Sequence, residues 1–162
     1  MASERQAWRP AESRLLAEYL AARWPHDRTI TRVRVGERHP GLTQADLTDP
    51  ERRMLGVWRR WVDAVIVLAA EVILVEAAIR PDPGDISQLD LYMRLWPATP
   101  EFADLRGRRA RGHLLYAQED PIIRQLALER GYTVEVWRPA WVDGYMESLS
   151  PRARRAPLTV LP

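Results

Sequence analysis

The 162-residue chain contains neither cysteine nor lysine. Without cysteine it can form no disulfide, no thiolate metal site and no cysteine nucleophile. All 24 basic residues are arginine, so every mechanism that needs a lysine amine from this chain is excluded. The net charge is only +2, so affinity for nucleic acid has to come from local arginine clusters and not from an overall basic field.

Sequence motifs for several common activities are also missing. The three histidines, His26, His39 and His113, lack the spacing of metal ligands. There is no phosphate-binding glycine loop and no Gly-x-Ser-x-Gly motif. Nucleotide hydrolysis by a P-loop and serine hydrolase chemistry therefore have no support in the sequence.

No segment reads as a secretory signal or a membrane span. Residues 1–14 lack the apolar stretch of a signal peptide. The longest apolar run, residues 62–79, contains Asp63, Glu71 and Glu76, and acids at the centre of a span are costly in lipid. We expect a cytoplasmic or intravirion protein that is not secreted and does not bind membranes.

The apolar pattern predicts one α/β domain over residues 1–138, followed by an extended tail over residues 139–162. Segments with helical spacing are interspersed with β-branched segments, which predicts a mixed central sheet flanked by helices on both faces. The tail has four prolines, three arginines and little periodicity. The expected helices are residues 10–24, 86–95 and 120–130, and the expected strands are residues 29–35, 57–68, 71–79, 112–117 and 132–137.

Two acids stand out because each lies in an otherwise apolar strand. Asp63 occurs in WVDAVIVL and Glu76 in EVILVEAAI. A buried carboxylate is costly unless it is paired, neutralised or bound to a metal. Two carboxylates on neighbouring strands predict a site for Mg²⁺ or Mn²⁺, since such hard cations prefer oxygen ligands. The competing interpretation is that nearby arginines, Arg59, Arg60 and Arg80, neutralise both acids.

In their order and spacing these residues resemble the PD-(D/E)XK nuclease superfamily, and most of all its RecB-type branch. The resemblance covers about residues 10–138 and implies a restriction-endonuclease-like core. It implies that Asp63 and Glu76 are the metal-binding acids and that Gln88 and Tyr92 form the Gln-x-x-x-Tyr element. It also implies a helix-borne glutamate, for which Glu12 and Glu18 are both candidates.

The sequence departs from this family at one catalytic position. The lysine of the family motif is replaced by Ala78, which can neither position nor activate a water molecule. Arg80 lies two residues further along and can supply charge, but a guanidinium cannot act as a general base. The resemblance therefore implies Asp63, Glu76, Gln88 and Arg80 as catalytic residues in an incomplete motif.

Two further regions are candidates for binding. The arginine loop, which we define as Arg106, Arg108, Arg109 and Arg111, can contact phosphates, or it can be a solvated loop that pairs with acids of a protein partner. Tyr92 either faces bound nucleic acid or packs in the core. Candidate anchors for the tail or for a protein partner are Trp137, Trp141, Arg152, Arg154 and Arg155. Four other tryptophans are expected in the core or in helix packing, namely Trp24, Trp58, Trp61 and Trp96.

Two main functions remain open at this stage, together with a variant of the second in which the protein is a transcription or defence regulator that binds nucleic acid without cutting it. The first is a divalent-metal-dependent DNA nuclease, or a degenerate relative that handles DNA. The alternative is a non-enzymatic assembly protein, such as a phage connector or head-completion protein, that keeps the nuclease fold and binds neighbouring subunits through its tail.

Overall fold

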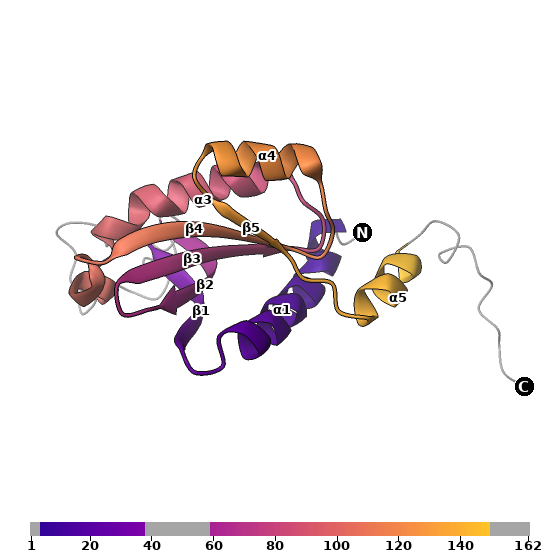
Figure 1. The fold of residues 1–162 in the computed structure, drawn as a ribbon, viewed down its shortest axis with the longest axis horizontal. Coiled ribbons are helices and arrows are strands. Elements are labelled where there is room, and N and C mark those ends of the chain that lie inside the picture. The colour runs from indigo at the N-terminus through magenta and orange to yellow at the C-terminus, as the bar shows by residue number, and fades with distance from the viewer. Residues whose placement is uncertain (1–3, 38–58, 150–162) are drawn as a thin grey trace, which may run out of the picture.

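The computed structural model describes residues 4–37 and 59–149, and these contain one five-stranded sheet (Figure 1). The strand order is β1-β2-β3-β4-β5. The β1–β2 and β2–β3 pairs are antiparallel, and the β3–β4 and β4–β5 pairs are parallel. The strands are β1 (Arg28–Val35), β2 (Arg60–Val67), β3 (Glu71–Ala78), β4 (Arg109–Tyr116) and β5 (Thr133–Val136).

Helices cover both faces of this mixed sheet, which confirms the predicted α/β class. Helices α3 (Pro83–Leu95) and α4 (Pro121–Glu129) lie on one face, and α1 (Glu4–Arg23) lies on the other (Figure 1). Helix α3, with the short 3₁₀ segments Trp96–Ala98 and Pro100–Leu105, forms the crossover from β3 to the parallel strand β4. Because helices cover both faces of β3, its sequence is a continuous apolar run and does not alternate apolar with polar residues.

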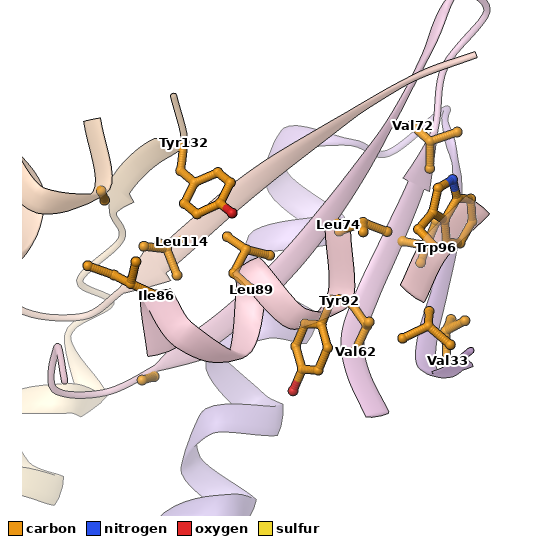
Figure 2. Close-up of a cluster of buried hydrophobic side chains, with 14 of the residues drawn as sticks. Val33, Val62, Val72, Leu74, Ile86, Leu89, Tyr92, Trp96, Leu114 and Tyr132 are labelled. Atoms are coloured by element: carbon orange, nitrogen blue, oxygen red, sulfur yellow. The ribbon is translucent and has the colours of Figure 1, made fainter. Parts of the chain in front are cut away.

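The apolar side chains form two cores, one on each face of the sheet. The α3-side core contains Val62, Leu74, Leu89, Trp96 and Leu114, which Figure 2 shows around α3. The α1-side core is the second layer, and its members include Leu15, Tyr19, Ile66, Ile73 and Val142. The sheet is therefore the middle layer of a three-layer domain.

Helix α1 is also attached to the sheet by polar contacts through Tyr19. The Tyr19 hydroxyl donates to Glu135 Oε2 at 2.9 Å and lies 3.1 Å from Nε2 of His113. His113 is buried and lies 2.7 Å from the Thr133 hydroxyl, and burial lowers its pKa to about 4. A neutral His113 therefore satisfies its polar neighbours without placing a charge under α1.

The packed region continues beyond residue 138, where we expected the extended tail to begin. Residues 141–148 form helix α5 (Trp141–Ser148), and Val142 is fully buried in the α1-side core. The indole of Trp141 donates to Glu18 at 2.8 Å, and Trp137 packs edge-on against Tyr19 at 6.0 Å between ring centroids. Three of the proposed partner-binding residues lie outside the described residues, namely Arg152, Arg154 and Arg155.

Across residues 4–37 and 59–149, none of the helices combines the length and the apolar character that a membrane crossing requires.

Gly112 provides a test of the packing between β4 and α3. A methyl group at this position would lie 2.5 Å from the Tyr132 ring and 2.9 Å from Leu89. We expect Gly112→Ala to lower the free energy of unfolding by about 1–3 kcal/mol because the site is already filled. Urea denaturation measures this change. Gly107→Ala is the matched control, since a methyl group there meets no atom within 4 Å, and equal stability losses in both variants would contradict the packing described here.

Candidate functional site

Asp63 and Glu76 face each other across β2 and β3, at the point where the pairing of these strands ends. The last paired residues are Ala64 and Val75, and the next position in the same register places Asp63 opposite Glu76. Directly opposite residues of an antiparallel pair project from the same face of the sheet. The structure thus brings together the two acids that the sequence predicts as metal ligands.

The carboxylate of Asp63 accepts a backbone hydrogen bond at the point where the pairing of β2 with β3 has ended. Its Oδ2 accepts a hydrogen bond from the Ala77 N–H at 2.9 Å. A backbone donor at the end of a buried ladder needs a partner, and here a side chain supplies it. Asp63 is consequently held in a fixed position while remaining partly accessible to solvent.

Glu76 is the more buried of the two acids, with 9% of its surface exposed. Its Oε2 atom is buried and has no hydrogen-bond partner. Burial, followed by the negative charges of Asp63, Asp85 and Glu12, raises the pKa of Glu76 to about 9, while the neighbouring Tyr92 hydroxyl opposes this rise. Glu76 is therefore protonated at neutral pH unless a cation binds beside it.

The predicted Gln-x-x-x-Tyr pair lies beside Glu76 on α3. The Tyr92 hydroxyl donates to Oε1 of Gln88 at 3.1 Å, so the two side chains lie on the same face of the helix, as their spacing predicts. Tyr92 is buried in the α3-side core, and Figure 2 shows its hydroxyl pointing out of that core. Burial and then the charges of Glu76 and Asp63 raise the pKa of Tyr92. Gln88 lies at the surface.

Asp85 and Tyr116 also belong to this site, although we did not predict a role there for either one. Asp85 accepts from the Asp82 N–H at 2.9 Å within the capping box that begins α3. Burial is the main cause that raises the pKa of Asp85 to about 6.

Tyr116 lies on β4 at the position paired with Ala78, the residue at which the resemblance implies a lysine. Its hydroxyl is buried and makes no hydrogen bond of normal geometry. Burial, followed by the Asp85 charge, raises the pKa of Tyr116. Only the pairing of β4 with β3 reveals this neighbour, because Tyr116 lies far from Ala78 in the sequence.

The structure distinguishes between the two candidate glutamates of α1. Glu12 is near enough for its charge to raise the pKa of Glu76. Glu18 instead accepts hydrogen bonds from Trp141 and from Arg14, each at 2.8 Å. Of the two, Glu12 is therefore the acid whose charge acts on Glu76.

Of the three arginines proposed to neutralise the acids, Arg59 is bound elsewhere, whereas Arg60 lies near enough to the site for its charge to oppose the rise in the pKa of Tyr92. Arg59 binds Glu101 at 2.7 Å and the Arg34 carbonyl at 2.8 Å, so it pairs with neither candidate metal ligand. Within residues 4–37 and 59–149, no arginine pairs with Glu76. Arg80 is exposed, two residues beyond the end of β3.

The arginine loop lies at the opposite end of the strands from the two acids. Arg109 pairs with Glu71 at the start of β3, five positions before Glu76, which corresponds to about 16 Å along the strand. Arg111 binds Glu71 at 3.1 Å, and Arg108 donates to the Leu68 carbonyl. These two contacts connect the ends of β2, β3 and β4, while Arg106 and Arg109 remain exposed.

The oxygen atoms of Asp63 and Glu76 are of the type that Mg²⁺ and Mn²⁺ prefer. In the described part of the chain, no three acidic or histidine side chains are grouped closely enough to hold a metal ion. Mg²⁺ is commonly held by one or two carboxylates together with waters and substrate phosphates. The pair therefore fits such an ion if water or substrate supplies the remaining ligands.

Comparison with known proteins shows only distant likenesses. No protein-family model matches this chain, and neither does any curated protein. Among solved structures, a repair endonuclease from Pyrococcus abyssi is similar with 18% identity and a TM-score of 0.48, over 80% of this chain and 47% of the endonuclease. A protein described as of unknown function is similar with 12% identity and a TM-score of 0.45, over 91% of this chain and 68% of the other. The chain thus spans about half the length of the endonuclease.

The raised pKa of Glu76 predicts how stability depends on pH. Without divalent cation, Glu76 has a pKa of about 9 in the folded protein and its usual pKa near 4.5 in the unfolded chain. Between these two values the folded wild type keeps a proton that the unfolded chain releases. The free energy of unfolding of the wild type therefore falls as pH rises through this range. The Glu76→Gln variant does not show this pH-dependent loss of stability, because the amide side chain does not titrate. Relative to wild type, we expect its free energy of unfolding to increase by about 1 kcal/mol or more between pH 5 and pH 8.

Urea denaturation at the two pH values, with EDTA present, measures this difference. The amide can also change the free energy of unfolding by the same amount at both pH values. Such a change does not affect the result, because only the difference between pH 5 and pH 8 is compared. Asp104→Asn, which removes an exposed acid, is the control and should follow the wild type at both values. An identical pH dependence in the wild type and Glu76→Gln would show that Glu76 is ionised in the folded protein.

Proposed function

We propose that this chain is a divalent-metal-dependent DNA nuclease of the PD-(D/E)XK type, with an incomplete catalytic motif and therefore low activity. The observation that carries the proposal is the buried, unpartnered Oε2 of Glu76 opposite Asp63. A cation between these carboxylates would satisfy that oxygen and remove the repulsion between the two acids. The Gln88–Tyr92 pair beside Glu76 supports the RecB-type branch.

A bound Mg²⁺ or Mn²⁺ would polarise a scissile phosphate ester as a Lewis acid. The chain's own residues provide the geometry. The Ala77 N–H orients Asp63, and Tyr92 lies against Glu76 while donating to Gln88 Oε1. Because that oxygen accepts from Tyr92, the amide NH₂ of Gln88 is available to donate to a phosphate oxygen.

The missing lysine limits the expected rate. Ala78 projects from the same face as Glu76, two positions along β3, and offers neither charge nor a proton acceptor. Arg80 can stabilise negative charge on a phosphate, but it stays protonated and cannot accept a proton. We therefore assign Arg80 to phosphate binding and no residue to the role of the motif lysine.

Metal binding is the first test of this proposal. We expect calorimetry to detect stoichiometric Mn²⁺ binding to the wild type, and we expect at least a tenfold loss of affinity in Asp63→Asn and in Glu76→Gln, since each variant loses a charged ligand. Asp104→Asn should bind as the wild type does. Cleavage of labelled single-stranded and duplex DNA, measured alongside, should require the metal. Absence of Mn²⁺ binding by the folded wild type at millimolar concentration would contradict the proposal.

Restoring the lysine is the second test. Ala78→Lys places an amine where the family motif has one, and we expect metal-dependent DNA cleavage to increase by about 10- to 100-fold, at or below the lower end of the range typical of a positioned proton-transfer group. Ala78→Met is the control, because it adds similar bulk without the amine. Circular dichroism establishes that both variants are folded. No gain in folded Ala78→Lys relative to Ala78→Met would mean that the site does not support this chemistry.

The alternative, an assembly protein that keeps the fold, is favoured by Ala78 itself. In that case the tail residues Arg152, Arg154 and Arg155 would bind a neighbouring subunit. Trp137 and Trp141 already contact α1 within the chain, so they would act by positioning the tail. Absence of both metal binding and cleavage would favour this alternative.

A further inference from the structure

Trp61 differs from the expectation that it lies in the core. It lies on β2 with 46% of its surface exposed, the largest exposed aromatic side chain among the described residues. It pairs directly with Arg34 across the β1–β2 ladder. Because β1 is the edge strand of the sheet, this position borders solvent on one side.

Two arginines of β1 lie against the indole ring. The guanidinium carbon of Arg34 is 4.5 Å from the Trp61 ring centroid, and that of Arg32 is 5.7 Å away. Neither arginine pairs with a carboxylate among the described residues. We call Arg32, Arg34 and Trp61 the Trp61 surface. It combines a flat aromatic ring with two positive charges that no acid in this part of the chain neutralises.

The backbone of Arg32 explains why these side chains gather on the outer side. Arg32 has φ of 53°, in the left-handed region that is unfavourable for residues other than glycine. Ile30 and Val33 both pack against the α3-side core although an odd number of positions separates them. A regular strand would place them on opposite faces, so the turn at Arg32 resets the alternation and leaves Arg32 and Arg34 outside.

We propose that the Trp61 surface binds single-stranded nucleic acid by stacking a base on the aromatic–guanidinium platform. An aromatic ring accepts any base, and the arginines bind the backbone phosphates without reading sequence. Bases inside a duplex are already stacked on their neighbours, so the platform selects single strands. The sequence of β1, RTITRVRV, has three arginines and no acid, which suits a polyanion.

The Trp61 surface lies close to the candidate site in the sequence, but the proposed binding does not depend on that site. Trp61 precedes Asp63 by two residues on β2, about 7 Å along the strand. Val62 packs in the α3-side core, so the neighbouring Trp61 projects from the face of the sheet opposite to that of Glu76. The binding itself uses neither carboxylate, so it stands even if the proposed nuclease activity does not.

Fluorescence anisotropy with a labelled 20-mer of thymidylate, in EDTA and at low salt, tests this binding. We expect Trp61→Ala to weaken it by about 5- to 150-fold, the range reported for removing one stacking aromatic residue. Trp61→Phe should retain most of the affinity. Arg32→Gln with Arg34→Gln should weaken binding and make the slope of log affinity against log salt shallower by about 1.4.

Ile122→Ala is the control, because it removes an exposed apolar side chain, 71% exposed, from α4 near the other edge of the sheet. It should bind as the wild type does. Unchanged affinity in folded Trp61→Ala would overturn the proposal, and so would equally tight, equally Trp61-dependent binding of a 20-base-pair duplex. Since EDTA removes divalent metal, failure of the nuclease proposal would leave these results unaffected.

Discussion

Two carboxylates that face each other inside a covered sheet set the main energetic constraint on this domain. Removing a charge from water costs several kcal/mol, and a second like charge directly opposite adds to that cost. The fold treats the two acids differently. Asp63 keeps access to solvent and accepts the Ala77 N–H, whereas Glu76 is buried and holds a proton. A divalent cation would replace that proton as the neutralising charge.

The elements around this pair are arranged to keep it in place. The β2–β3 ladder stops one residue before the acids, which frees the Ala77 N–H for Asp63. The capping box of α3 fixes the start of that helix, so that Tyr92 three turns later meets both Glu76 and Gln88. The geometry of the site thus depends on secondary-structure boundaries as much as on the functional side chains themselves.

Much of this arrangement follows from the sequence, because its strongest signals are local. The apolar runs around Asp63 and Glu76 identify the two central strands, and the four-residue spacing of Gln88 and Tyr92 identifies a shared helix face. The features that sequence reasoning missed depend on contacts between distant segments. Tyr116 comes to lie beside Ala78 only through parallel pairing of β4 with β3.

Helix α5 and the exposure of Trp61 were not predicted, for related reasons. Helix α5 has only eight residues, too few for a clear periodic pattern, and contacts with α1 hold it in place. The exposure of Trp61 depends on the left-handed backbone at Arg32, which no propensity of arginine indicates. The arginine loop was recognised as a basic cluster, but its distance from the acids depends on strand register.

Three unfavourable features meet at one end of β2. Glu76 is buried without a partner for Oε2, Arg32 has a strained backbone at the register position opposite Asp63, and Trp61 is exposed next to them. A glutamine, a glycine and a polar residue at these positions would each relieve a cost without disturbing the fold. Backbone strain and buried ionisable groups of this kind are characteristic of functional sites, where ligand binding offsets their cost. Their coincidence within a few residues is the reason that we place the proposed ligand binding at this end of the sheet and not at the arginine loop.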